Sequence, residues 1–209
     1  MNVEWEDLSP AQIEERSFAI IESELPHPLD PALAPVIKRV IHTTADFSYA
    51  DSLCFSPGAV EKALCAIRRG ASIVTDTNMG KAGINKAALA RRGGEVFCFM
   101  ADEDVARDAK EKNATRAAAS MEKACTLHRP LIFAIGNAPT ALIRLCELME
   151  EGKLRPELVI GVPVGFVNVV PSKELLMTAD VPYIVARGRK GGSNVAAAIC
   201  NALLYMLGR

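Results

Sequence analysis

Short apolar runs alternate with longer amphipathic stretches along most of this chain. Five of the runs are short, apolar or β-branched, and bounded by Gly, Asp or Pro, as buried parallel strands are. The predicted strands are Ser72–Thr75, Val96–Phe99, Leu131–Ile135, Leu158–Val162 and Tyr183–Val185. This alternation predicts parallel strands connected by helices, which is the pattern of an α/β fold.

Helix-like segments lie before and between these strands. Pro57–Arg69, for example, has a proline at its start and ends before Gly70. The predicted helices are Ala11–Glu24, Ala32–Thr43, Pro57–Arg69, Asn113–Leu127, Pro139–Glu151 and Ser193–Leu207. We expect residues 1–209, half of them hydrophobic and without repeat or linker, to form one three-layer α/β/α domain. Its parallel sheet should have about five strands.

The composition argues against several classes of partner. A net charge of −1 gives no indication of nucleic acid or an anionic membrane. The N-terminal MNVEWEDLSP is acidic and polar, unlike a secretory or transit peptide. The longest uncharged apolar stretch, Leu158–Val170, is short and contains Pro163, so we do not expect it to span a membrane. Six dispersed cysteines without a CxxC pair favour reduced thiols in a cytoplasmic protein over disulfides or zinc.

The loops that follow the predicted strands are the expected ligand-binding region, because ligands of open parallel sheets lie beyond the carboxyl ends of the strands. In AIGNAPTAL, Gly136 permits a tight turn and Asn137 can cap the next helix, which predicts free N–H groups facing the ligand. In GVPVGFVNV, glycines such as Gly165 let a large flat ligand approach the backbone.

The loop after the last predicted strand, ARGRKGGSN, carries the strongest anion signal. It holds three cations before a Gly-Gly-Ser helix start, and cations together with a helix N-terminus favour an anion. Its candidate residues are Arg187, Arg189, Lys190, Gly191, Gly192 and Ser193. Ordinary βα-loop chemistry explains GNAP equally well. No GxxxxGK[ST] is present and no GxGxxG follows the first predicted strand, so a nucleotide site has no motif support.

RVIHTTADF places His42 near the end of a predicted helix, three residues after Arg39 and positioned to share its face. A histidine there is more often a partner of the helix dipole than a catalyst. A metal site is not expected, because His27 and His128 are distant and no HxxxH or HExxH occurs. No GxSxG supports a Ser-His-Asp hydrolase. The residues alone leave His42 open between a helix-end role and acid–base catalysis.

Six strings in order carry a family resemblance: ERSFAII, RVIHTTADF, TDTNM…AGI, GNAPTAL, GVPVGFV and RGRKGGS. Over nearly the whole chain, from about residue 10 to 209, the sequence resembles the precorrin-8X methylmutases, corrin-ring isomerases of cobalamin biosynthesis. HTTADF, TDTNM and MEKA resemble the oxygen-independent branch, whose substrate already carries cobalt.

The resemblance implies a flavodoxin-like fold, a homodimer, and a reaction without cofactor or resident metal. A methyl group moves from C-11 to C-12 of precorrin-8 or its cobalt form, giving hydrogenobyrinate or cobyrinate. His42 matches the family's acid–base residue, and Ser17 and Arg39 match positions that contact substrate. The predicted substrate-binding residues are Ser17, Arg39, Thr44, Asp46, Arg116, Gly136, Asn137, Gly165, Arg187, Gly191, Gly192 and Ser193.

Histidine suits this role because its ordinary pKa of roughly 6.5 permits proton donation and recovery near neutral pH. We expect Thr43, Thr44 and Asp46 either to orient the His42 ring or to cap the same helix end. Two other functions stay open from the residues: a corrinoid carrier without catalysis, and a phosphate-ester or nucleotide enzyme using GNAP and RGRKGGS as phosphate cradles. Only the isomerase should produce an optical change on turnover.

Overall fold

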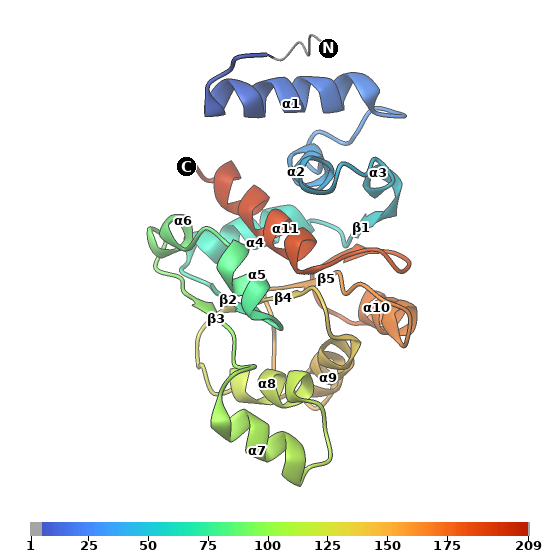
Figure 1. The fold of residues 1–209 in the computed structure, drawn as a ribbon. Coiled ribbons are helices and arrows are strands. Elements are labelled where there is room, and N and C mark those ends of the chain that lie inside the picture. Colours follow the sequence, from blue (N-terminus) through green and yellow to red (C-terminus); the bar gives the residue numbers. More distant parts are fainter. Residues whose placement is uncertain (1–5, 209) are drawn as a thin grey trace, which may run out of the picture.

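A computed structural model, described for residues 6–208, shows a six-stranded sheet with helices on both faces (Figure 1). The strands are β1 (Leu53–Phe55), β2 (Ser72–Thr75), β3 (Val96–Phe97), β4 (Leu131–Ile135), β5 (Leu158–Gly161) and β6 (Tyr183–Ala186). Their order across the sheet is β1-β6-β5-β4-β2-β3. The strands β2 to β6 pair in parallel, so the prediction of an α/β fold with five parallel strands is confirmed.

The five parallel strands have the order of a flavodoxin-type fold. Numbered among themselves along the chain, their order β3-β2-β4-β5-β6 is 2-1-3-4-5. The order reverses between β2 and β4, and a fold of this type usually binds its ligand at the carboxyl ends of those two strands.

The strand β1 lies at the sheet edge and is antiparallel to β6, with Leu53 opposite Ala186 and Phe55 opposite Ile184. It was not predicted, so the expectation that the sheet begins at Ser72–Thr75 is wrong. Because the pair is antiparallel, β1 starts beside the carboxyl end of β6. The segment just before β1 therefore lies at the ligand-side edge of the sheet.

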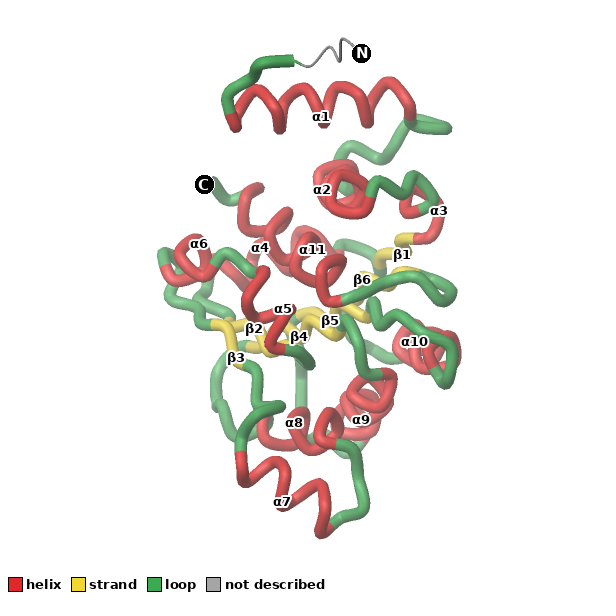
Figure 2. Tube along the Cα trace, in the orientation of Figure 1, coloured by secondary structure: helices red, strands yellow, loops and turns green. Residues whose placement is uncertain are grey.

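The helices are α1 (Pro10–Glu24), α2 (Ala34–Thr44), α3 (Tyr49–Ser52), α4 (Ala59–Arg68), α5 (Asn78–Gly83), α6 (Lys86–Ala90), α7 (Glu103–Glu111), α8 (Arg116–Ala124), α9 (Pro139–Glu150), α10 (Val169–Thr178) and α11 (Ser193–Met206). The predicted helices correspond to α1, α2, α4, α8, α9 and α11 within a few residues. One face of the sheet carries α2, α4, α5 and α11, and the other carries α8, α9 and α10 (Figure 2). The helix α1 lies outside α2, and α7 lies outside α8 (Figure 1).

Each face of the sheet has its own apolar core. In β4, Ile132 and Ala134 belong to the core under α11, whereas Phe133 and Ile135 belong to the core over α9. Burial on both sides explains why this strand is an uninterrupted apolar run. No helix among residues 6–208 is long and apolar enough to cross a bilayer.

Candidate functional site

The loop after β6, residues 187–192, contacts the chain that follows α2. We call it the cation loop. Lys190 Nζ donates to Asp46 Oδ2 at 2.6 Å and to Ser48 Oγ at 2.9 Å. The hydrogen bond from Lys190 lowers the pKa of the Asp46 carboxyl. This contact brings two strings that are 144 residues apart, RVIHTTADF and RGRKGGS, into one place.

The loop after β5 packs directly on the cation loop. Gly165 N–H donates to the Arg189 carbonyl at 3.2 Å, and Gly192 N–H donates to the Val162 carbonyl at 2.9 Å. A Cβ at Gly191, whose φ is +155°, would lie 2.1 Å from Val162 O. The glycines predicted to let a flat ligand approach the backbone belong to GVPVGFVNV, Gly165 among them, and that role stays a prediction. Gly191 and Gly192 were predicted as part of the helix start of an anion site, and at Gly191 the neighbouring loop occupies the space that a side chain would need.

The carboxyl ends of β2 and β4 are closed by a buried carboxylate, Asp76. Its Oδ1 accepts from Gly136 N–H at 2.9 Å, and its Oδ2 accepts from the N–H groups of Asn137 and Ala138 at 2.8 and 2.6 Å. Burial raises the pKa of Asp76, and the three N–H donors oppose that rise. A Cβ at Gly136 would lie 2.6 Å from Ser193 Cα.

The prediction of free N–H groups in GNAP is therefore wrong, because all three amides donate to Asp76. Asn137 does not cap α9 either, since the residue before the helix is Ala138 and no side chain caps it. At the usual binding position of a flavodoxin-type sheet, these amides are thus bound by a carboxylate of the protein itself. A phosphate cradle built on these three backbone amides has no free donor to offer, which removes the support for a nucleotide enzyme there.

The hydroxyl of Thr77 links the loop after β2 to the start of α11. It lies 2.7 Å from Ser193 Oγ at the start of α11, and it also accepts from Gly80 N–H at 3.0 Å. The predicted substrate residue Ser193 therefore already has a hydroxyl partner. We did not single out Asp76 or Thr77 from the sequence, although a polar Asp-Thr pair directly after a predicted strand is a usable signal.

His42 is exposed in the last turn of α2, and its ring stacks on Phe18 of α1. The ring centroids are 5.4 Å apart with an interplanar angle of 30°. Within residues 6–208, neither ring nitrogen of His42 has a hydrogen-bond partner. Both are therefore accessible to a ligand. Ser17, the neighbour of Phe18, donates its hydroxyl to Ile13 O at 2.7 Å.

The threonines beside His42 bond to their own helix. Thr43 Oγ1 donates to Arg39 O at 2.9 Å, and Thr44 Oγ1 donates to Val40 O at 2.8 Å. Asp46 accepts from Lys190 instead. None of these bonds is made to the His42 ring, and the threonine hydroxyls donate to carbonyls inside the helix rather than at its end, so both roles suggested for Thr43, Thr44 and Asp46 stay predictions. The side chain that fixes the ring is Phe18, supplied by a different helix.

Arg39 is nearly buried at the junction of three helices. Its guanidinium donates to Glu14 at 2.6 Å and lies over the rings of Phe18 and Tyr205, 4.8 and 5.2 Å from their centroids. It therefore joins α1 to α2 and α11, on the same side of α2 as the Phe18–His42 stack. A shallow cavity of about 350 Å³ opens beside it and is lined by Phe18, Pro35, Lys38, Arg39, Ala202, Tyr205 and Met206.

The cations of the cation loop differ in what they bind. Arg187 makes a bidentate ion pair with Glu174, with both N–O distances 3.0 Å. Arg189 has no carboxylate partner among the described residues, and its guanidinium lies over the exposed ring of Phe166 at 5.5 Å. Both arginines were predicted cations of an anion site, but only Arg187 was among the predicted substrate-binding residues. Arg189 is the more available of the two to an anionic ligand.

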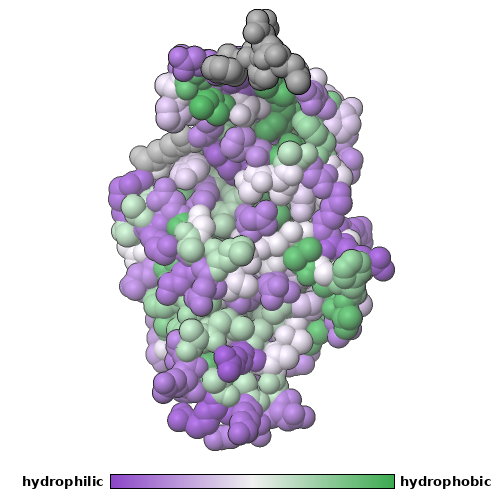
Figure 3. Space-filling view, viewed as in Figure 1, coloured by the Kyte–Doolittle hydropathy of each residue, from purple (hydrophilic) through white to green (hydrophobic). Residues whose placement is uncertain are grey.

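An exposed apolar tip lies beside Arg189, in the loop before α10. Its large apolar side chains are Val164, Phe166 and Val167, of which Phe166 is 81% exposed. Figure 3 shows an apolar patch at the right edge of the molecule, at the level of α10. An apolar surface next to an unpaired guanidinium suits a flat ligand that carries carboxylates at its rim.

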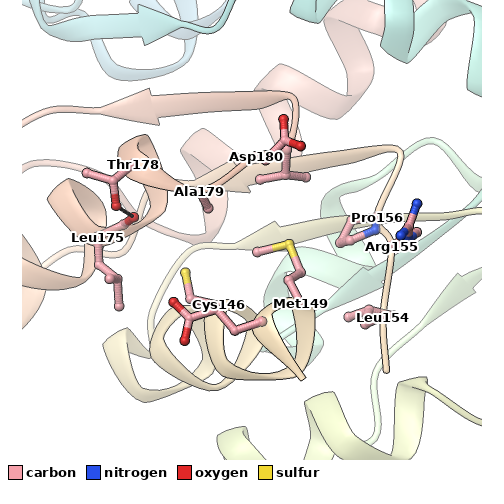
Figure 4. Close-up of a pocket in the computed structure, with 11 residues that line it drawn as sticks. Cys146, Met149, Leu154, Arg155, Pro156, Leu175, Thr178, Ala179 and Asp180 are labelled. Atoms are coloured by element: carbon pink, nitrogen blue, oxygen red, sulfur yellow. Dashed lines mark hydrogen bonds between the residues drawn. The ribbon is translucent and has the colours of Figure 1, made fainter. Parts of the chain in front are cut away.

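Two features lie away from the end of α2, the cation loop and the loop before α10. Arg116 is exposed at the start of α8, on the opposite face of the sheet, and makes no hydrogen bond or ion pair with the described loops. A cavity of about 420 Å³ between α9 and α10 is lined by residues such as Cys146, Met149 and Leu175 (Figure 4). Its other walls, residues 154–156 and 179–181, precede β5 and β6, so it lies at the amino end of the sheet.

No group of three or more His, Cys, Asp or Glu side chains placed to hold a metal ion occurs in the part of the chain that the structure describes. The end of α2, the cation loop and the loop before α10 together offer three groups. These are the exposed His42 imidazole stacked on Phe18, the Arg189 guanidinium, for which the described residues hold no carboxylate partner, and the apolar tip. These groups suit proton exchange with a large flat anion.

Comparison with known proteins gives a consistent result. A family model described as precorrin-8X methylmutase matches residues 12–206. A protein of Priestia megaterium named cobalt-precorrin-8 methylmutase is 47% identical over 197 residues, covering 94% of this chain and 88% of the relative. A protein of the same name from Salmonella typhimurium is 45% identical over 205 residues, covering 95% and 96%. A solved precorrin-8x methyl mutase from Thermus thermophilus has a TM-score of 0.86 at 44% identity, covering 94% of this chain and 95% of that one.

Proposed function

The chain belongs to the precorrin-8X methylmutase family, and on that premise we propose that His42 is the acid–base residue of its methyl-shift reaction. The activity is that of an isomerase of cobalamin biosynthesis, acting on a tetrapyrrole. The proposed substrate is the cobalt form of precorrin-8, in agreement with the names of the relatives from Priestia megaterium and Salmonella typhimurium.

The observation that supports this role of His42 is that its ring nitrogens are available to exchange a proton with a ligand. Its ring nitrogens have no partner within residues 6–208, and its ring is held by Phe18 rather than by a hydrogen bond. A proton delivered to a ring nitrogen of the macrocycle makes the neighbouring carbon electron-poor and eases migration of the methyl group. General acid–base help of this kind contributes about 10²–10⁴-fold to the rate. The remaining acceleration comes from holding the macrocycle in a reactive geometry.

The proposed binding surface extends from His42 to the cation loop. Lys190, paired with Asp46, connects the end of α2 to this loop, and Arg189 offers its guanidinium beside the apolar ring of Phe166. A macrocycle with carboxylates on its rim can stack on the apolar side chains and pair with the cation. Arg187 contributes less to this surface, because Glu174 already neutralises it.

We also propose that the active form is a homodimer. The site is open to solvent in one copy, and Phe166, Val167 and Met79 are large apolar side chains that are at least 70% exposed. A second copy placed over such a surface would add a wall to a site that must enclose a macrocycle. Sedimentation should show a dimer at working concentration. A monomer with full activity would contradict this part of the proposal.

The decisive experiment is single-turnover spectroscopy on the His42→Ala variant, with precorrin-8 and with its cobalt form as substrates. We expect normal folding, retained binding, and a rate about 10²–10⁴-fold lower than that of the wild-type protein. His27→Ala is the matched control, since His27 bonds to Asp51 and Pro28 outside this cluster. Near-normal conversion by His42→Ala would remove the catalytic role. Binding without any optical change in the wild-type protein would favour a carrier.

A further inference from the structure

Lys173, in the middle of α10, has a fully buried side chain. Its ammonium has no carboxylate partner within residues 6–208, which is rare for a buried lysine. Instead, Nζ donates to two backbone carbonyls, that of Gly188 at 2.7 Å and that of Lys190 at 2.8 Å. Burial lowers the pKa of Lys173 to about 8, so removing this group from water has a cost.

The two carbonyls flank a single residue, Arg189. Lys173 therefore holds the backbone immediately before and immediately after the one guanidinium of the cation loop that has no carboxylate partner among the described residues. The same segment is also held by Gly165, whose N–H donates to the Arg189 carbonyl at 3.2 Å. Three consecutive carbonyls of the loop are thus fixed from two neighbouring segments.

We propose that Lys173 is a positioning residue for substrate binding. By fixing the carbonyls of Gly188 and Lys190, it presets Arg189 beside Phe166 to receive a carboxylate of the macrocycle. This inference rests on the proposed function for the identity of the ligand. The anchoring itself does not depend on it.

Packing alone is a poor explanation for a lysine at this position. A Met or Leu side chain would fill similar volume without the penalty of burying an amine. The amine, in contrast, supplies donors to the carbonyls of Gly188 and Lys190, which an apolar side chain could not do. A glycine-rich loop has a large conformational freedom to lose, and fixing it before the substrate arrives lowers the entropic cost of binding.

The first experiment tests the anchor without any substrate. Trypsin cleaves after exposed basic residues, and the cation loop offers Arg187, Arg189 and Lys190. We expect Lys173→Met to be cut at these positions about tenfold faster than the wild-type protein, while thermal melting still shows a cooperative transition. Lys153→Met, at an exposed lysine paired with Glu151, is the matched control and should be cut at the wild-type rate. If Lys173→Met does not fold, Lys173→Leu, which also removes the donors, replaces it.

The second experiment is a double-mutant cycle of Lys173→Met and Arg189→Gln, read as the Kd for cobalt-precorrin-8. We expect each single variant to raise Kd by about tenfold, and the double variant to be no worse than Arg189→Gln alone. A purely structural role would give additive effects, or an effect on melting only.

The outcomes separate this inference from the proposed function. Unchanged trypsin cleavage in Lys173→Met, or additive effects on Kd, would overturn the positioning role. Faster cleavage together with non-additive Kd values supports it. If the wild-type protein does not bind either form of precorrin-8, the proposed function fails, and the substrate part of this inference falls with it. The cleavage experiment still decides whether Lys173 anchors the loop.

Discussion

Replacing Asp76 by Ala tests whether a single carboxylate closes the carboxyl ends of β2 and β4. The substitution leaves the N–H groups of Gly136, Asn137 and Ala138 without their acceptor. Each buried N–H left unpaired costs about 1–3 kcal/mol, and water can reach the exposed residue Asn137. The expected loss is therefore about 3–5 kcal/mol, mostly from Gly136 and Ala138. For a chain of this size, that lowers the melting temperature by about 6–20 °C.

The assay is urea unfolding monitored by circular dichroism, with a thermal melt beside it. Asp180→Ala, at an exposed aspartate with no hydrogen bond among the described residues, is the matched control and should change stability by less than about 0.5 kcal/mol. Asp76→Asn should fall between the two, because its amide oxygen still accepts while its NH₂ group faces a donor. A loss below about 1 kcal/mol for Asp76→Ala would refute the reasoning, since it would mean that the three amides find other acceptors without cost.

Three further predictions concern α1, α2 and α10. Phe18→Ala, which removes the stack on His42, should lower kcat about 2–10-fold while the protein remains folded, as measured by steady-state kinetics; an unchanged kcat would mean that the stack does not orient the ring. Arg39→Ala should lower the melting temperature, because Arg39 pairs with Glu14 and joins three helices; because Glu14 already neutralises it, it should raise the substrate Kd less than Arg189→Gln does, and a larger rise would place Arg39 in the site. The pKa of Lys173 is about 8 in the folded chain, against an ordinary value of 10.5. Between these pH values the unfolded chain binds this proton more than the folded chain does. The free energy of unfolding of the wild-type protein, relative to that of Lys173→Met, should therefore rise with pH across this range. Urea titrations at several pH values check this last prediction, which a flat or falling difference would contradict.

The site was predictable only in part, because a sequence shows which residues are polar but not which of them bind one another. The cations of RGRKGGS were correctly assigned to one loop, yet Arg187 is paired with Glu174, whereas Arg189 has no carboxylate partner within residues 6–208. GNAP has the composition of an anion-binding loop, but its N–H groups face a carboxylate of the protein itself. Local composition gives the donors, and only the fold supplies their acceptors.

The sequence by itself determined the five parallel strands, because strands buried on both faces must be continuously apolar and such runs are visible without a structure. Its ordered strings also indicated the family. The tertiary structure alone decided where His42 lies. The strand β1 has only three residues, and nothing in LCF predicts that it pairs with β6. A strand this short is stabilised by its partner rather than by its own pattern. That pairing, with the contact from Lys190 to Asp46, brings the end of α2 to the carboxyl edge of the sheet, 144 residues away along the chain from the loop it meets.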